Sequence, residues 1–587
     1  AGRCLRRNAA WILIGACRGA VIGFVLGAAL FLGHLVFGDD AAFRAIVAAL
    51  QSPNARVGAA VGAIIAAVAW LYWPSELSWV FRRSFWNLWG WLKFVLNKPQ
   101  NITPPPEKLG TLRPEPLRTA IPDIPIGSIQ AVPENQIPAD ERYWLQSFVY
   151  KIQVWLYWAF SPMQPGLYPI AADPQWALNH AYRRLQRKTF DPPDLPPEYE
   201  GSPDLGSLAV RGPYACYTEK LDDGLYLWDL RKLEEYGCQD GLYQLGARVL
   251  FHLDLTAGRL VPCAIESALG TSQPADSNWQ LAKKLALCSV TTHLSLVRHF
   301  NWVHLASGAH LAVATRNCLP KDHPLCRLLW PHIYGTQQSN DTVTRGQMVP
   351  GGDFETTFSL TYDGMCRLFE QSYQDFRIVV NDPEQDGTSR GIRGGGFETP
   401  TQKNLEDLFG VIKEHVENYL GMYYPDNPSG ERDRAIKNDQ SILKWLDTLN
   451  DGRIPNGVAV TSTDVTFDKL CRLVARFIYM VTVQHEMAGS FLWNYQLWTH
   501  RQPVRVYKNG QREPLDVYQR LVNANYNLNV DRRLLMDDFS CLALDANGRA
   551  AYGRFQSELA ALQKRYEDEP WEVWRMYPKT LKVNINA

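Results

Sequence analysis

The segment HLSLVRHFNWVH, residues 293–304, constrains the fold more than any other stretch, because it places three histidines on one predicted helix. On a regular α-helix, His299 lies roughly 140° around the axis from His304 and roughly 120° from His293. His293 and His304 share a face but lie about 16 Å apart, so one ion cannot bind both. A π-type turn would bring histidines five residues apart together, and such turns are frequent at functional sites. The segment therefore predicts a metal site only if the helix is distorted.

Charge and cysteine content limit the classes of partner and framework. Lys+Arg and Asp+Glu both number 60, so the net charge is zero and nothing indicates nucleic acid as a partner. The 11 cysteines form no CxxC pair, which favours buried reduced thiols over a disulfide framework or a zinc finger. No Walker loop or HExxH motif is present.

Two uncharged runs near the start, residues 19–38 and 57–75, are each long enough to cross a bilayer core of about 30 Å. A cleavable signal peptide is the alternative for the first run, but its apolar stretch is too long and a second run follows. Small residues recur every fourth position in both, which predicts a transmembrane hairpin and could also let copies pair as oligomers. Flanking arginines and lysines place both ends in the cytoplasm. We expect an integral membrane protein, in contact with membrane lipid, with a cytoplasmic catalytic domain.

The chain divides into three predicted parts. Residues 1–98 form the membrane anchor, including an aromatic interfacial helix after the hairpin, and residues 99–135 form a proline-rich linker. Residues 136–587 form the catalytic domain, which we expect to be mainly α with small β pieces. The apolar stretch Tyr143–Phe160 is interpreted as a core or interfacial helix rather than a third span, because Lys151 lies near its middle.

Several blocks in the predicted catalytic domain resemble the lipoxygenase family. WQLAKK (279–284) is similar to W-x-LAK, and the histidine-rich segment 299–332 resembles a stretch of histidines running into LP-x-x-HP-x-x-x-LL-x-PH. GGDFETTFSLTYDGM (351–365) is similar to G-x-x-ETTF-x-x-x-x-Y-x-x-M. VTVQHEMAG (481–489) resembles QH-AAVN, and the final PKTLKVNINA (578–587) resembles P-x-x-IPNSISI. The blocks follow family order from roughly residue 180 to the end.

This resemblance implies a mainly helical lipoxygenase-like catalytic domain built around long helices that hold one non-haem iron. The family's N-terminal β-sandwich is absent from the sequence, and we expect the hairpin to replace it. Manganese is the credible substitute for iron. The implied activity is that of a dioxygenase that takes a hydrogen atom from the CH₂ between two cis double bonds and adds O₂. The product is a hydroperoxide of a polyunsaturated fatty acyl chain or a similar lipophilic polyene.

The resemblance also implies a set of metal ligands. His299 aligns with a helical ligand, His485 aligns with the histidine of the second core helix, and Ala587 would supply its main-chain carboxylate. The family's first ligand falls on Leu294, which cannot bind metal. The third imidazole is therefore His304, His293 or neither.

Two glycines lie at positions to which the resemblance assigns a role, one in metal binding and one in the site of oxygen addition. Gly489 stands where the family has Asn, His or Ser, so water would fill that position or Glu486 would turn in. Gly351 falls near the residue beside the reacting carbon, where a glycine leaves room for oxygen; the alternative is a plain turn glycine in Pro350–Gly352.

Three functions remain open at this point. The first is the membrane-anchored iron dioxygenase described above. The second keeps the fold and metal but runs other oxidative lipid chemistry, such as desaturation or hydroperoxide rearrangement. The third is a metal-free lipid-binding scaffold.

Overall fold

The computed structural model describes residues 102–107, 109–117, 126–142, 195–394, 397, 399–426, 430–510, 521, 533–569 and 576–585. All of them belong to one compact unit, Trp91–Ala587. The expected anchor (1–98) and the stretch Tyr143–Phe160 lie outside the described residues. The division into anchor, linker and catalytic domain therefore stays a prediction.

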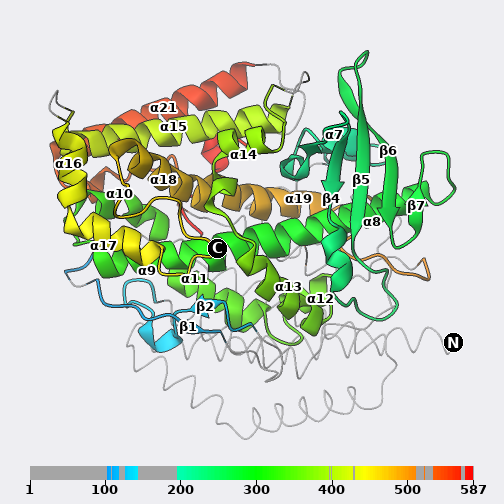
Figure 1. The fold of residues 1–587 in the computed structure, drawn as a ribbon, viewed down its shortest axis with the longest axis horizontal. Helices are drawn as coiled ribbons and strands as arrows, with labels where there is room; N and C mark the ends of the chain where they lie inside the picture. The colour runs from blue at the N-terminus through cyan, green and yellow to red at the C-terminus, as the bar shows by residue number, and fades with distance from the viewer. Residues whose placement is uncertain are drawn as a thin grey trace, which may run out of the picture. The chain divides into compact units, whose positions relative to one another are not determined.

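The described part is mainly helical, as the sequence predicts (Figure 1). Its α-helices are α7 (Leu205–Leu208), α8 (Trp279–His293), α9 (Ala309–Cys318), α10 (Pro324–Ile333), α11 (Thr336–Thr342), α12 (Asp353–Thr357), α13 (Tyr362–Gln374), α14 (Pro383–Ser389), α15 (Pro400–Tyr423), α16 (Glu431–Asn438), α17 (Gln440–Leu449), α18 (Phe467–Tyr479), α19 (Leu492–Gln496) and α21 (Ala546–Asp568). Four π-helical segments are η5 (Leu294–Gly308), η6 (Val343–Gln347), η8 (Met480–Gln484) and η9 (Met487–Phe491). Short 3₁₀ turns are η1 (Glu134–Gln136), η2 (Pro197–Tyr199), η3 (Pro213–Tyr217), η4 (Arg231–Glu235), η7 (Ile378–Asn381), η10 (Ser540–Leu542) and η11 (Pro578–Thr580).

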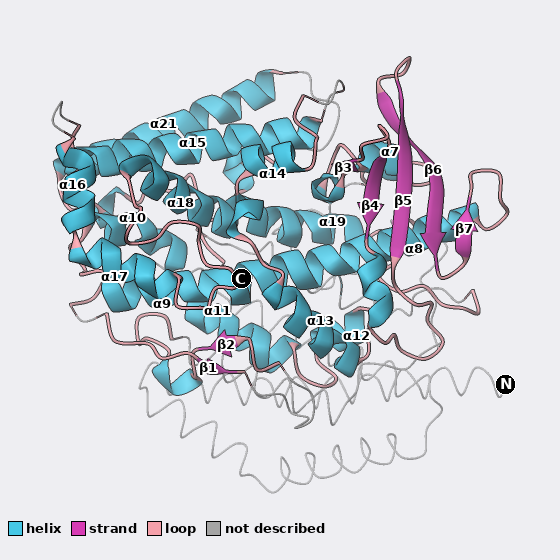
Figure 2. Cartoon of the chain, viewed as in Figure 1, coloured by secondary structure: helices cyan, strands magenta, loops and turns pink. Residues whose placement is uncertain are grey.

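The expected small β pieces form two antiparallel sheets (Figure 2). Five strands pair in chain order: β3 (Glu219–Lys220), β4 (Tyr226–Asp229), β5 (Ala247–Asp254), β6 (Arg259–Ser267) and β7 (Gly270–Ser272). On β5, Ala247, Val249 and Phe251 are buried and alternate with more exposed residues, so one face of the sheet packs inward against α7 and α8. β1 (Glu115–Pro116) and β2 (Gln130–Ala131) form a separate pair.

The helical core is organised around α15, which packs against α18 and α21. Leu405, Leu408, Phe409, Ile412 and Val416 recur at helical spacing along α15 and are all buried. Pro400 occupies the first turn, where its missing N–H costs no hydrogen bond. Helix α18 continues within this core into η8 and η9, so residues near 485 are packed on several sides.

Ion pairs also connect α18 to the start of α14. The buried carboxylate of Asp382, which caps α14, accepts hydrogen bonds from Arg472 and Arg476 of α18. Because both oxygens are paired, the buried charge is compensated.

The expected integral-membrane location needs correction. Within the residues that the structure describes, no helix is both long enough and apolar enough to cross a bilayer. The two runs at 19–38 and 57–75 that suggested the hairpin lie outside the described residues. That prediction was based on run length, missing charge, the spacing of small residues and the flanking cations.

We predict that His415→Phe stabilises the protein, and more so at lower pH. The ring of His415 stacks on Phe555 with centroids 4.1 Å apart, and among the described residues neither ring nitrogen has a hydrogen-bond partner. Removing these unpaired atoms should raise the free energy of unfolding by about 1–3 kcal/mol at pH 7.5. Burial lowers the pKa of His415 to about 3, so below pH 6.5 only the unfolded chain gains this proton and wild-type stability falls.

Urea unfolding at pH 7.5 and pH 5 measures both effects. His252→Phe, at an exposed position of β5, is the control and should show no gain that grows on acidification. Equal stability of wild type and His415→Phe at pH 5 would contradict the prediction.

Candidate metal centre

The long helical segment that begins with α8 changes from α-helical to π-helical geometry where its histidines lie. Helix α8 continues without a break into the π-helix η5 and then into α9. His299 and His304 both belong to η5, and their ring centroids lie 5.1 Å apart. The wider π turns place two residues five apart on one face, as the distorted-helix hypothesis requires.

The third imidazole belongs to the helical segment that continues from α18. His485 lies between η8 and η9, and its ring centroid is 4.7 Å from that of His299 and 5.1 Å from that of His304. One potential ligand atom from each of the three histidines lies within 4.8 Å of the others. All three side chains are buried. We call His299, His304 and His485 the triad.

Hydrogen bonds on the outer side of the rings indicate which nitrogens face inward. His304 Nδ1 lies 3.3 Å from Asn340 Oδ1, and His485 Nδ1 lies 3.2 Å from Glu486 Oε1. In the tautomers that donate from Nδ1 to these oxygens, each Nε2 carries a lone pair. The two Nε2 atoms face each other at 3.2 Å. Two lone pairs at that distance repel, and a cation between them removes the conflict.

The third ring supports the same interpretation. Neither nitrogen of His299 has a hydrogen-bond partner among the described residues, although the side chain is fully buried. An unpaired buried nitrogen costs free energy unless something binds it. The triad therefore fits a metal ion, and imidazole donors suit iron and other first-row ions.

The protonation states suit metal binding. Burial, followed by the neighbouring imidazoles, lowers the pKa of His299 well below its usual range. Burial and His485 likewise lower the pKa of His304, against a smaller raising effect of Asn340. Both rings are neutral at pH 7, the form that binds metals.

His293 is not part of the triad. Its Nδ1 lies 2.7 Å from the hydroxyl of Tyr217, and its ring packs edge-on against Trp302. Burial lowers the pKa of His293 to about 3. Of the two candidates for the third imidazole, the structure brings His304 and not His293 to His299 and His485, because the π turn begins only after His293.

The other histidines of the 299–332 segment take structural positions. His310 Nε2 lies 2.9 Å from the hydroxyl of Tyr373, and His323 caps α10 by accepting from the Leu325 N–H. His332 donates from Nδ1 to the carbonyl of Val583, 2.8 Å away.

Gly351 lies in a turn. Its φ is +71°, which favours glycine, and its N–H donates to Glu355 Oε2 at 2.6 Å. The following helix α12 brings Phe354 against Phe300, the residue after His299, with ring centroids 4.3 Å apart. The turn that holds Gly351 therefore connects to the apolar side of the triad, while a specificity role for Gly351 stays a prediction.

The C-terminal segment approaches the same helices. Leu581, Val583 and Ile585 are buried, and the Ile585 carbonyl accepts from Ser339 Oγ. Ala587, the expected carboxylate ligand, lies outside the described residues.

Gly489 and Glu486 differ in how they relate to the triad. A Cβ on Gly489 would lie 3.1 Å from Cε1 and 3.2 Å from Nε2 of His299, so position 489 faces the triad directly. The Glu486 carboxylate instead bonds Lys582 at 2.8 Å and the outer nitrogen of His485. Neither Asn340 nor Lys582 had a signal in the sequence, because each is a single polar residue in an otherwise unremarkable segment.

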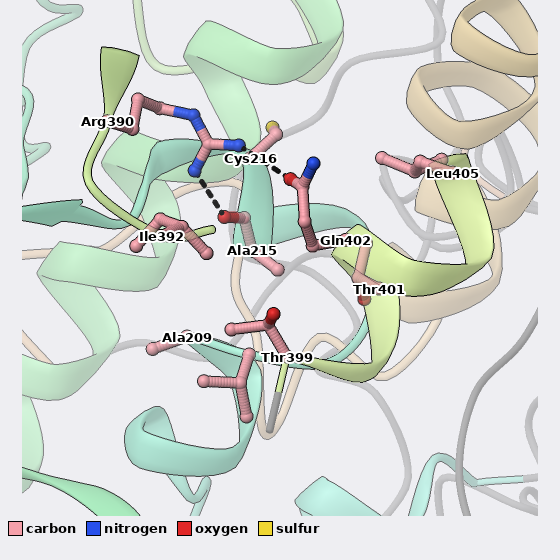
Figure 3. A pocket seen from close by; sticks show the side chains of 10 residues that line it. Ala209, Ala215, Cys216, Arg390, Ile392, Thr399, Thr401, Gln402 and Leu405 are labelled. Carbon is pink, nitrogen blue, oxygen red and sulfur yellow. Dashed lines mark hydrogen bonds between the residues drawn. The ribbon is translucent and has the colours of Figure 1, made fainter. Parts of the chain in front are cut away.

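A separate cavity lies between the η3 region and the start of α15 (Figure 3). Arg390 lines it, but its guanidinium is engaged with Asp386, Gln402 and the carbonyl of Thr218. Burial raises the pKa of the lining thiol of Cys216, so it is not a reactive thiolate. This cavity offers no chemistry comparable to that of the triad.

Comparisons with known proteins give a consistent result. Residues 246–524 match the Lipoxygenase family model. The polyunsaturated fatty acid lipoxygenase ALOX15 of Oryctolagus cuniculus is 24% identical over 354 residues, which is 54% of this chain and 52% of that one. The manganese lipoxygenase of Pleurotus sapidus is 24% identical over 250 residues, 41% of this chain and 37% of that one. The chain thus spans about half or less of these relatives.

Solved structures support the same fold. A coral 8R-lipoxygenase superposes with a TM-score of 0.66 at 16% identity, covering 80% of this chain and 79% of that one. The manganese lipoxygenase of Gaeumannomyces graminis gives a TM-score of 0.60 at 14% identity, covering 83% of this chain and 96% of that one.

We predict that Gly489→Ala weakens metal binding without weakening the fold. The new methyl group would press on the His299 ring and shift it by a few tenths of an ångström. The affinity for Mn²⁺, measured by chelator competition, should fall about tenfold or more, as when a ligand's support is disturbed. Gly410→Ala, on α15 with nothing within 4 Å of the added carbon, is the control and should leave the affinity unchanged. Unchanged affinity in Gly489→Ala would mean that position 489 does not face the bound ion.

Proposed function

The chain is a divergent member of the lipoxygenase family, and we propose that it is a non-haem iron dioxygenase acting on a polyunsaturated lipid, with manganese as the alternative ion. The observation that carries this proposal is the triad, in which three buried imidazoles from two core helices converge and one of them, His299, has no partner for either nitrogen among the described residues.

The triad residues have separable roles in this proposal. His299, His304 and His485 would hold the ion, with Asn340 and Glu486 fixing two of the rings from outside. A redox-active ion held there supplies the one-electron chemistry that removes a hydrogen atom from an activated CH₂. Phe300 packs on the His299 ring at a centroid distance of 4.4 Å and keeps that side apolar, which suits a hydrocarbon chain and excludes water.

The substrate class comes from the relatives. The ALOX15 proteins are polyunsaturated fatty acid lipoxygenases by name, and we extend that class to this chain. Addition of O₂ to the carbon radical, followed by return of the electron and the proton that the C–H cleavage released, would give a hydroperoxide. The proposed partners are therefore a polyunsaturated fatty acyl substrate and O₂.

Other parts of the ligand set stay predictions. The carboxylate of Ala587 and a water beside Gly489 would complete the coordination of the ion, and Gly351 would direct the position of oxygen addition. Pairing of copies through the glycine-rich segments near the start concerns residues outside the described part.

A second candidate function keeps the metal and changes the reaction. It is favoured by the altered ligands, because leucine replaces the family's first helical ligand and glycine its weak one. Hydroperoxide rearrangement by such a site would consume no O₂. Oxygen uptake with linoleate and arachidonate, and then with their hydroperoxides, separates the two reactions.

We predict that the purified protein carries close to one iron or manganese ion per chain by elemental analysis. His299→Ala, His304→Ala and His485→Ala should each lose most of this metal, because two imidazoles from this buried site hold an ion far more weakly than three. Oxygen uptake with a polyunsaturated fatty acid should disappear with the metal.

His293→Ala is the matched control, since it removes a partly buried imidazole of the same helical segment that contacts Tyr217 instead of the triad. It should retain the metal. Loss of metal in His293→Ala together with its retention in His304→Ala would overturn the ligand assignment, and a wild-type protein without iron or manganese would overturn the proposed function.

A further inference from the structure

A buried ion pair lies directly behind the triad. Glu486 and Lys582 have side-chain exposures of 1% and 9%, and Glu486 Oε2 lies 2.8 Å from Lys582 Nζ. Lys582 also donates to the hydroxyl of Ser490, four residues after Glu486. The lysine of the C-terminal segment therefore contacts two residues one turn apart on the helix that carries His485.

The second oxygen of the same carboxylate faces the triad. Glu486 Oε1 lies 3.2 Å from His485 Nδ1, on the side of the ring opposite His304. A carboxylate in this place accepts the Nδ1–H and leaves Nε2 free to bind an ion. One side chain thus connects an imidazole of the triad to the C-terminal segment.

Stability alone does not account for this pair. A buried ion pair gains little over a well-packed apolar pair of the same size, because both charges lose their hydration. The family patterns quoted above have alanine after the histidine and proline at the position of Lys582, so this sequence departs from those patterns at both charged positions. The geometry gives them a use that an apolar pair would lack, namely the orientation of His485.

Hydrogen bonds hold the C-terminal segment next to Lys582 in place. The carbonyl of Val583 accepts from His332, the carbonyl of Ile585 accepts from Ser339, and the amide of Asn584 donates to the Pro331 carbonyl. Lys582 therefore extends from a fixed backbone, and its ammonium group can hold the Glu486 carboxylate in one place.

We propose that Glu486 is a positioning residue that fixes the His485 ring with Nε2 toward the metal ion, and that Lys582 couples the C-terminal segment to this ring through Glu486. The proposal rests on the proposed function, since it requires that the triad binds a metal. It adds a support for one ligand that the family patterns do not contain.

Two double variants of equal side-chain length test the proposal. Glu486→Met with Lys582→Met removes both charges and the hydrogen-bond acceptor, whereas Glu486→Gln with Lys582→Met removes both charges but keeps an acceptor for His485 Nδ1–H. The affinity for Mn²⁺, measured by chelator competition, should fall about 10–100-fold in the first variant. The second variant should recover part of that loss, because its amide oxygen still accepts the bond although Lys582 no longer holds that side chain in place.

Lys579→Met is the control for the C-terminal segment. Lys579 pairs with Glu567 at the surface, where the side chains are 57% and 50% exposed, so its loss should leave Mn²⁺ affinity unchanged. Wild-type affinity in the double-methionine variant would overturn the inference and leave the proposed function standing. A wild-type protein that binds neither Mn²⁺ nor Fe²⁺ would instead overturn the proposed function itself.

A second measurement does not depend on the Glu486 and Lys582 variants. In metal-stripped wild-type protein labelled with ¹⁵N-histidine, the His485 signals, assigned by their loss in His485→Ala, should report a proton on Nδ1. A proton on Nε2 would overturn the proposed role of Glu486, since the carboxylate would then face an unprotonated nitrogen.

Discussion

The structure depends on one energetically costly arrangement, in which three imidazoles face one another in a buried space. Each ring loses its hydration, and in the tautomers indicated by Asn340 and Glu486 two of the inward nitrogens offer lone pairs to each other. A bound cation is the simplest way to compensate these costs. π-Helical geometry lies at this point in both segments: His299 and His304 belong to η5, and His485 lies between η8 and η9.

The triad has apolar side chains on one side and a pair of charged side chains on another. Phe300 packs against His299 and Phe354 packs against Phe300, so this side of the triad is apolar, which suits the proposed lipid substrate. Behind His485 lie Glu486 and Lys582, whose opposite charges compensate each other. We interpret this asymmetry as a substrate side and a support side of one site.

The sequence was sufficient for the class of fold and for two of the three histidines. The family-like blocks place His299 and His485 on different core helices, and the structure brings these two rings together. The choice between His293 and His304 could not be made, because it depends on the residue at which the π turn begins, and no local pattern marks that residue. The contact between Glu486 and Lys582 spans 96 positions and leaves no local signal at all. The membrane prediction was wrong for a different reason: its grounds were local sequence features alone, and within the described residues no helix is long and apolar enough to cross a bilayer.

The most direct test of the account is a crystal structure of Mn²⁺-loaded protein with anomalous diffraction recorded at the manganese edge. We expect one strong peak within bonding distance of His299, His304 and His485 together. A peak elsewhere, or no peak at the triad when manganese is present in excess, would contradict the central claim that these three imidazoles form a metal site.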